Sequence, residues 1–339
     1  MDTRKLFLFS GLVSLAALPS LASAQKTVTV GGEGAWACAT SNSPATLSDG
    51  ITEASADLTF DWDASTHTLW LTVENTSPVE IGVPNPLITS IYFNLPAGAV
   101  DDITLLSQSA PGSVHPCFSF DEDENLFDRS NPLKAGCMGA FGARLDIQGI
   151  RGAIANADAD TLAGPPGSQV IGPATFEFHV DGEGVDTLTS SAFAGAFSMN
   201  PPGIYQVNTA IHFQAGGVAC VSDFVGNTFE CAPAGWMTGE PRIGHTVTFT
   251  MAAAPGCHGC LAYSTDPGPS QLGALVLPIG APAHVLLPGI APSSGTVSRS
   301  ITIPQDPTLV GNTYYFAVAT ISGGGVLEFS EAFDITILP

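Results

Sequence analysis

We predict an all-β protein made of two antiparallel β-sandwich domains, of the immunoglobulin-like or jelly-roll-like type, that follow a signal peptide. Apolar and polar residues alternate with period two in many short windows, and clusters of glycine and proline separate these windows (37 Gly and 26 Pro). The spacing of apolar residues that is typical of a helix is weak throughout the sequence. Short strands between turn residues are typical of antiparallel sandwiches, and 339 residues are enough for two of them.

The first residues have the pattern of an export signal. Basic residues precede an apolar stretch that ends at the small-residue site 22–24, so we expect a Sec-type signal peptide over 1–24 with cleavage before Gln25. The alternative is a membrane anchor, but Pro19 interrupts a stretch that is already shorter than the roughly 20 apolar residues of a spanning helix. No later segment is long enough to span a bilayer, so we expect a protein that is secreted or located in the cell envelope.

The composition is strongly acidic but contains few charges. The formal net charge is −22, while only 12% of the residues are charged and 45% are hydrophobic. An acidic surface repels nucleic acid and anionic lipid, so we expect neither as a partner. The hydrophobic fraction is sufficient for packed cores and argues against a disordered chain.

The clearest pair of strands lies in 56–75, which reads ADLTFDWDASTHTLWLTVEN. Apolar residues alternate with polar ones on both sides of a short link, which is the signal of a hairpin. Pairing of Asp63 with Thr68 would place Trp62 beside Leu69 on the core side. The hairpin is therefore expected to contribute one complete apolar face to a sandwich.

The same pairing places Asp61 opposite Trp70 on the polar side of the hairpin. An aromatic ring with a hydrogen-bonding acid beside it is the arrangement that a carbohydrate-binding surface uses. The alternative is that Trp70 packs beneath the segment 111–170. Exposure of Trp70 in a concave patch would favour carbohydrate binding, whereas its burial would remove that interpretation.

We place a domain boundary after residue 242, which gives an N-terminal sandwich over 25–242 and a C-terminal one over 243–339. The loop CAPAGWMTGEPRIG precedes a new strand pattern, HTVTFTM, and the chain ends on another strand pattern that we expect to join a sheet. Residues 111–170 are rich in proline, glycine and acids and are expected to form a loop-rich insertion. Only 140–154 has weak helical spacing, and glycines interrupt it.

The end of the chain contains the phrase IPQDPTLVGNTYY. It matches the pattern IPxDPxLVGxTxY at Ile303, Pro304, Asp306, Pro307, Leu309, Val310, Gly311, Thr313 and Tyr315, and Ala317 stands where glutamine is usual. On these residues, about 250–339 resembles a C-terminal domain of large secreted proteins of planctomycetes and related marine bacteria. The resemblance implies an appended β-sandwich without an assigned chemistry.

Two stretches of the first domain carry a looser resemblance. They are LTFDWDASTHTLWLTVENTS and NTAIHFQAGGVACVSDFVG, the second with its strand over 211–216. Both are similar to exported β-sandwich proteins that exosortase sorts (the PEP-CTERM type). The sorting tail that defines those proteins is absent, so we do not expect attachment to the envelope by that route.

Seven cysteines should oxidise outside the cytoplasm where their geometry allows. The spacing favours three bridges: Cys220–Cys231, Cys117–Cys137 and Cys257–Cys260. Cys38 is then left over, or it takes Cys117 or Cys137 and frees another cysteine.

The motif CHGC at 257–260 could also suit other chemistry. A thioredoxin-like redox pair needs a helix N-terminus in a βαβ unit, but the flanks here are Pro-Gly and Leu-Ala-Tyr. Attachment of haem needs a histidine where Leu261 stands, and a zinc site needs a second pair of ligands. We therefore expect a disulfide clasp.

Two acidic loops, DEDENLFD and NADAD, have the spacing of calcium ligands. Their candidate residues are Asp121, Asp123, Asn125, Asp128, Asn156, Asp158 and Asp160. Calcium prefers several oxygen ligands on flexible loops. An EF-hand is not expected, because Leu126 and Pro132 occupy its glycine and glutamate positions. The alternative is a pair of solvated acidic loops, and no other cofactor is expected.

Motifs of catalysis are missing from the sequence. It contains no GxSxG, HExxH, phosphate-binding glycine loop or dinucleotide fingerprint, so we do not expect an enzyme. The leading prediction is an exported structural or adhesive protein of the cell envelope or extracellular matrix, with glycans or envelope components as partners. The alternatives are a carbohydrate-binding module, assisted by calcium, and a secreted hydrolase with its site in 111–170.

Overall fold

A computed structural model gives the fold of the chain. It describes residues 25–31, 37–39, 54–78, 86–122, 133–135, 139–147, 151–156, 169–196, 207–215, 222–226, 231–272, 275–322 and 325–339. Within these residues the chain is mostly strand, and its helices are α1 (Ser190–Gly195) and the 3-10 turns η3 (Val185–Thr187) and η4 (Pro307–Leu309). The predicted all-β class is confirmed. The predicted signal peptide lies outside the described residues.

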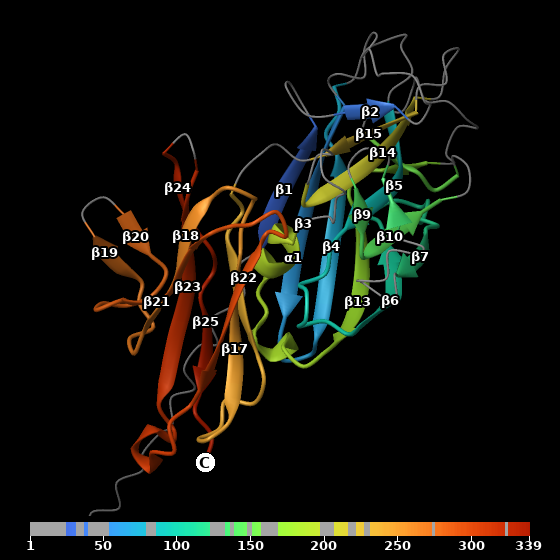
Figure 1. The fold of residues 1–339 in the computed structure, drawn as a ribbon. Coiled ribbons are helices and arrows are strands. Elements are labelled where there is room, and N and C mark those ends of the chain that lie inside the picture. The colour runs from blue at the N-terminus through green and yellow to red at the C-terminus, as the bar shows by residue number, and fades with distance from the viewer. Residues whose placement is uncertain are drawn as a thin grey trace, which may run out of the picture.

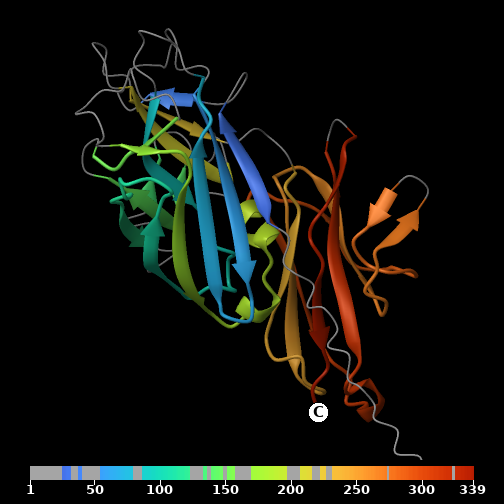
Figure 2. The same cartoon turned by 180° about the vertical axis from the view of Figure 1, so that it is seen from behind.

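Two β-sandwiches lie side by side, the first blue to green and the second orange to red (Figures 1 and 2). One layer of the first sandwich, which we call sheet 1, has the order β1-β3-β4-β13-β6. Its strands are β1 (Lys26–Gly31), β3 (Ser55–Asp63), β4 (Thr68–Asn75), β13 (Ala174–Asp181) and β6 (Asp102–Ser109). All neighbours in sheet 1 are antiparallel.

The β3–β4 hairpin has the predicted register. Asp63 pairs with Thr68, and Trp62 pairs with Leu69. Trp62 is 1% exposed and Leu69 is fully buried, so the apolar face of the hairpin is a wall of the core. Full burial of side chains of this size stabilises the fold by about 1.5–3 kcal/mol each.

The second layer, which we call sheet 2, has the order β12-β11-β5-β14-β15-β2, and β10 and β7 extend it beyond β5. Its strands are β12 (Val170–Ile171), β11 (Ile154–Ala155), β5 (Pro86–Phe93), β14 (Thr209–Ala215), β15 (Ser222–Gly226), β2 (Ala37–Ala39), β10 (Ala143–Asp146) and β7 (Ser119–Glu122). Side chains from both sheets form one continuous core. The weak helical pattern at 140–154 is wrong as a structural signal, because its described residues form strands.

Most of the described part of 111–170 forms strands of sheet 2 itself, namely β7, β10 and β11, and its aromatic side chains contact β13 of sheet 1. Phe118 contacts Phe176 and Phe120 contacts Phe178, with ring centroids 5.3 and 5.1 Å apart. The hairpin of β8 (Leu133–Lys134) and β9 (Ala140–Phe141) covers the outer face of sheet 2 through a small separate core. That core consists of Tyr92, Ala135, Phe141, Val207 and Ala210. The outer face of sheet 2 is thus covered near Tyr92 of β5 and Ala210 of β14.

The second sandwich also has two layers. One has the order β16-β17-β22, and the other has the order β21-β18-β23-β24 with β25 also paired to β23. The strands are β16 (Ala234–Thr238), β17 (Thr246–Ala252), β22 (Thr296–Thr302), β21 (His284–Ile290), β18 (His258–Ser264), β23 (Thr313–Ile321), β24 (Leu327–Phe329) and β25 (Phe333–Thr336), and β19 (Ser270–Leu272) and β20 (Leu275–Leu277) form a side hairpin. As predicted, the last strand joins a sheet.

Strand β16 belongs to both sandwiches. Its backbone pairs with β17 in the second sandwich. Because successive side chains of a strand point to opposite faces, Trp236 enters the core of the first sandwich while Met237 enters the core of the second. The predicted boundary after residue 242 falls in the turn between β16 and β17. Strand β17 also contributes to both cores, because Ala252 lies in the first core while Met251 lies in the second. The two cores are therefore joined through the pair β16 and β17.

A disulfide joins Cys231, just before β16, to Cys257, just before β18. The predicted bridges Cys220–Cys231 and Cys257–Cys260 are therefore wrong. Cys260 is a free thiol within β18. Cys257 and Cys260 are three residues apart, and three residues of extended chain span about 10 Å. Bridged cysteines have Cα atoms no more than roughly 7 Å apart, so an extended strand keeps these two cysteines from pairing.

The predicted bridge Cys117–Cys137 is wrong as well, because Cys117 is an exposed free thiol. Cys137, Cys220 and the side chain of Cys38 lie outside the described residues. Burial raises the pKa of the Cys260 thiol. The reactive thiolate of Cys260 is thereby disfavoured.

Candidate functional site

The outer face of sheet 1 carries one large aromatic side chain, that of Trp70. Leu69 and Leu71 face the core, so Trp70 between them points outward and is partly exposed. Asp61 of β3 and Glu177 of β13 are its direct cross-strand neighbours. Directly opposed residues have Cβ atoms about 4.5–5.5 Å apart, so an aromatic ring lies between two carboxylates. The broad face of β3 and β4 is turned to the viewer in Figure 2.

Both carboxylates are held from their outer sides. Gln25 Nε2 donates to Asp61 Oδ2 at 2.8 Å, and Ser107 Oγ donates to Glu177 Oε2 at 2.7 Å. Among the described residues, no donor contacts the second oxygen of either carboxylate. The two acids are thus oriented by the protein, and each keeps a second oxygen as an acceptor at a position directly opposite Trp70 on the neighbouring strand.

A row of hydroxyls lies next to the Trp70 row on the same face. Thr27 Oγ1 and Thr59 Oγ1 are 2.9 Å apart, and Thr72 Oγ1 and Thr175 Oγ1 are 3.0 Å apart. These residues come from β1, β3, β4 and β13 in register. The face around Trp70 is therefore broad and polar with a single apolar ring.

The structure brings together Trp70 and Asp61, the two residues predicted for ligand binding. The described part of 111–170 belongs mainly to sheet 2, on the other side of the core, and Trp70 stays partly exposed. Sequence reasoning missed Glu177. Its strand reads ATFEFHVD, and the alternation in this stretch already placed Glu177 on the polar face of a strand.

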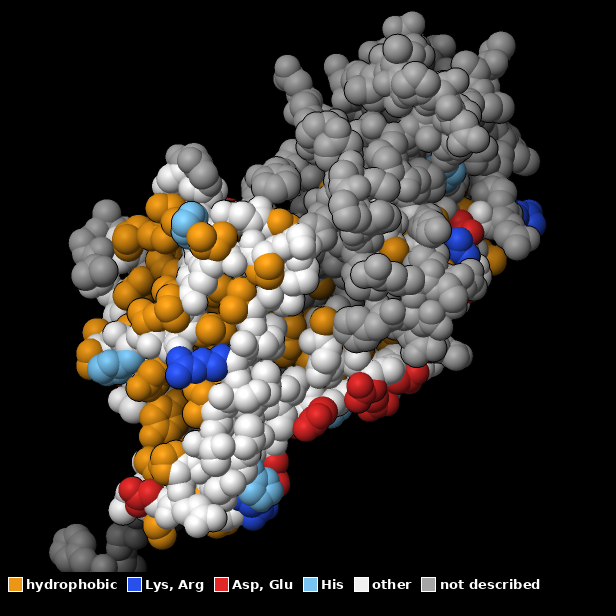
Figure 3. All heavy atoms as spheres, viewed as in Figure 1, with side chains coloured by type: hydrophobic (Ala, Val, Ile, Leu, Met, Phe, Trp, Pro, Cys, Tyr) orange, Lys and Arg blue, Asp and Glu red, His pale blue; other side chains and the backbone are white. Residues whose placement is uncertain are grey.

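An acidic edge with two histidines lies at the end of sheet 1. Figure 3 shows acidic side chains along the lower edge of the first sandwich, and the exposed acids there are Asp101, Asp102, Asp181, Glu183 and Asp186. His67 Nε2 lies 2.9 Å from Asp186 Oδ1, and His179 Nε2 lies 3.4 Å from Asp181 Oδ1. Within the described parts of the chain, no group of three or more potential ligands is placed to hold a metal ion.

Two predicted calcium ligands lie in the described chain, and both contact protein groups. Asp121 Oδ2 accepts a hydrogen bond from Arg144 Nε at 3.2 Å. Asn156 Nδ2 donates to the carbonyl oxygen of Ser77. The other predicted ligands, Asp123, Asn125, Asp128, Asp158 and Asp160, lie outside the described residues. Calcium binding stays a prediction.

His212 is a half-buried titratable group on the outer face of sheet 2. Burial lowers the pKa of His212 below its ordinary value of 6.5, and the charge of Asp146 opposes this only in part. The Nδ1 atom of His212 lies 2.7 Å from Thr89 Oγ1. The neutral imidazole is therefore the form that the folded state prefers.

We expect His212 to make the protein less stable in mild acid. Below about pH 6.5 the unfolded chain takes up a proton that the folded chain refuses, so the free energy of unfolding falls until the pH reaches the lowered pKa. In His212→Asn the fall in unfolding free energy that protonation of His212 causes should be absent. Urea unfolding at several values between about pH 7 and 5 measures it, with His258→Asn at an exposed position as control. Equal pH dependence in His212→Asn and the native protein would contradict the assignment.

Comparison with known proteins adds little. No protein-family model and no curated protein matches the chain. Among solved structures, it is similar to the β-glucuronidase of Parabacteroides merdae, with 9% sequence identity over 92% of this chain and a TM-score of 0.20. The chain spans about a third of that enzyme's length (35%). A TM-score this low supports no inference. In the described part of the chain, no helix has the length and apolar character to cross a membrane.

Proposed function

We propose that the protein is an exported adhesive protein without catalytic activity, and that the outer face of sheet 1 binds extracellular carbohydrate. The observation behind this proposal is the partly exposed Trp70 ring between two carboxylates that the protein itself orients. An aromatic face packs against the C–H groups of a sugar ring, while acceptors at its sides take the hydroxyl hydrogens. Asp61, Trp70 and Glu177 supply the aromatic face and the two acceptors in one row across the sheet.

The shape and charge of this face favour a neutral polysaccharide. Five strands form a broad surface with rows of side chains that cross the sheet, which suits an extended chain better than an isolated small molecule. The net charge of −22 repels acidic polysaccharides. We therefore place neutral glycans, with free hydroxyls and without carboxylate or sulfate groups, as the ligand class.

A glycan array with native protein and Trp70→Ala tests this proposal. We expect binding to neutral glycans by the native protein and a loss of about tenfold or more in the variant, since stacking and apolar burial together contribute about 1–2 kcal/mol. Leu106→Ala is a matched control, because Leu106 is 56% exposed on strand β6 of the same sheet.

The array should be run with calcium and with a chelator. We expect the same binding in both conditions, because within the described chain no ligand cluster for a metal lies on this face. Two results would refute the proposal: no glycan bound by native protein in either condition, or glycan binding that Trp70→Ala leaves unchanged.

A further inference from the structure

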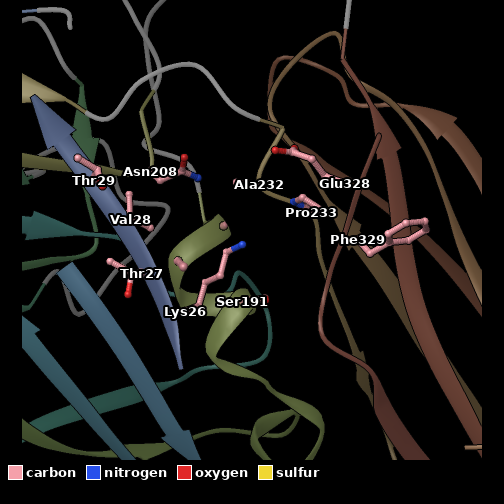
Figure 4. A pocket seen from close by; sticks show the side chains of 12 residues that line it. Lys26, Thr27, Val28, Thr29, Ser191, Asn208, Ala232, Pro233, Glu328 and Phe329 are labelled. Atoms are coloured by element: carbon pink, nitrogen blue, oxygen red, sulfur yellow. The ribbon is translucent and has the colours of Figure 1, made fainter. Parts of the chain in front are cut away.

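A cleft of about 420 Å³ lies between the two sandwiches. One wall is formed by β1 and α1 of the first sandwich, and the other by β24 and the segment at residues 232–233 (Figure 4). Pockets of about 300–1,000 Å³ are the usual size for small-molecule ligands. The cleft lies at the β1 edge of sheet 1, and Trp70 lies two strands away on β4.

Two side chains of opposite charge point into this cleft from opposite walls. Figure 4 shows Lys26 reaching in from β1 and Glu328 reaching in from β24. Within the described residues neither forms an ion pair, and Glu328 Oε2 is buried without any hydrogen-bond partner. A buried carboxylate oxygen without a donor is unfavourable, because its hydrogen bonds to water have been lost and not replaced, so this atom points to a missing donor.

The other polar groups nearby are already used by the protein. Glu331 accepts a hydrogen bond from the backbone N–H of Ser191 at 3.1 Å. Thr27 Oγ1 is paired with Thr59, and Thr29 Oγ1 donates to Asp57 Oδ1 at 2.8 Å. Among the lining residues that carry a charge, the groups that remain for a ligand are the ammonium of Lys26 and the carboxylate of Glu328, and the uncharged amide of Asn208 lies in the same lining.

We propose that the cleft binds a small zwitterion, a molecule with one ammonium and one carboxylate group such as a free amino acid or a short peptide. Its ammonium donates to the carboxylate of Glu328, and its carboxylate pairs with the ammonium of Lys26. The ligand ammonium is attracted by Glu328 and repelled by Lys26, and the ligand carboxylate is attracted by Lys26 and repelled by Glu328. The two charges of the cleft therefore also fix the direction in which the ligand lies.

Ligands with a single type of charge fit the cleft less well. An anion would meet Lys26 but also Glu328 and the nearby Glu331, while a cation would meet Glu328 but be repelled by Lys26. A neutral sugar brings no charge to pair with either Lys26 or Glu328. Discrimination against each of these classes therefore follows from the two facing charges.

Isothermal titration of the protein with a defined set of compounds tests this inference. The zwitterions are glycine, 4-aminobutyrate, 6-aminohexanoate and dialanine, which differ in the distance between their charges. The single-charge and neutral controls are acetate, methylamine and glucose. We expect at least one zwitterion to bind at least tenfold more tightly than all three controls.

Variants then assign the binding to the cleft. Lys26→Met and Glu328→Gln should each weaken the best zwitterion about tenfold or more. Glu74→Gln removes the same charge at an exposed position of β4 and should change nothing, and Trp70→Ala should also leave this binding intact. Thermal unfolding confirms that each variant is folded. The inference is overturned if native protein binds none of the zwitterions, if any of the three controls binds as tightly, or if folded Lys26→Met or folded Glu328→Gln binds like the native protein.

Discussion

Replacement of Trp236 by alanine should destabilise the protein by about 3–5 kcal/mol and divide its unfolding into two separate transitions. Trp236 is 1% exposed and packs in the core of the first sandwich, although its strand β16 is hydrogen-bonded within the second. Truncation of a buried tryptophan removes its apolar contacts and leaves a cavity. Because this cavity would lie where the two cores meet, the cooperativity between them should be lost as well.

Urea unfolding followed by circular dichroism and fluorescence measures both effects. The native protein should show one transition. Trp62→Ala is the matched control, because Trp62 is also 1% exposed but lies within the first sandwich alone. It should lower the stability of the first sandwich and leave the midpoint of the second unchanged. A single transition in Trp236→Ala with a loss below about 1 kcal/mol would show that β16 does not couple the two cores.

Removal of the disulfide between Cys231 and Cys257 has the second largest expected effect. The bridge closes a loop with a sequence separation of 26 residues, and bridges of this kind stabilise proteins by about 2–4 kcal/mol. Cys257→Ser should therefore lose about that amount of unfolding free energy, and a reducing agent should give the native protein a similar loss. This is a large part of the roughly 5–15 kcal/mol that holds a typical domain folded.

Cys260→Ser provides the matched control, because Cys260 is a free thiol three residues away. This variant should be about as stable as the native protein, and a reducing agent should destabilise both by the same amount. Alkylation followed by intact-mass measurement checks the pairing in parallel. Equal stability of Cys257→Ser and Cys260→Ser would contradict the bridge as a stabilising element.

Where one face of a strand is buried, its register could be predicted from the sequence. The β3–β4 hairpin is the clearest example, since a slip by one residue would move Trp62 and Leu69 from the core to solvent. The disulfide could not be predicted in the same way, because its two cysteines are brought together by the pairing of β16 with β17. The helix α1 also escaped prediction. All six of its residues are buried, so it has no polar face and no amphipathic period.

The residues of the candidate sites could likewise be predicted only where they are close together in the sequence. Asp61 and Trp70 are neighbours within one hairpin, so local alternation was enough to place them together. Glu177 joins them only through the pairing of β4 with β13, which connects distant parts of the chain. Lys26 and Glu328 come from the beginning and the end of the described chain, and only the contact between the two sandwiches makes them face each other.

The position of the disulfide also determines how the protein responds to tension. If the outer face of sheet 1 is held at a surface and the C-terminal end is pulled, the force must cross from the first sandwich to the second near β16. The bridge between Cys231 and Cys257 encloses β16 and β17 in a covalent loop. Force that enters at Cys231 therefore passes through the sulfur atoms directly to β18. The hydrogen bonds between β16 and β17 are spared, and these two strands cannot be extended while the bridge is intact.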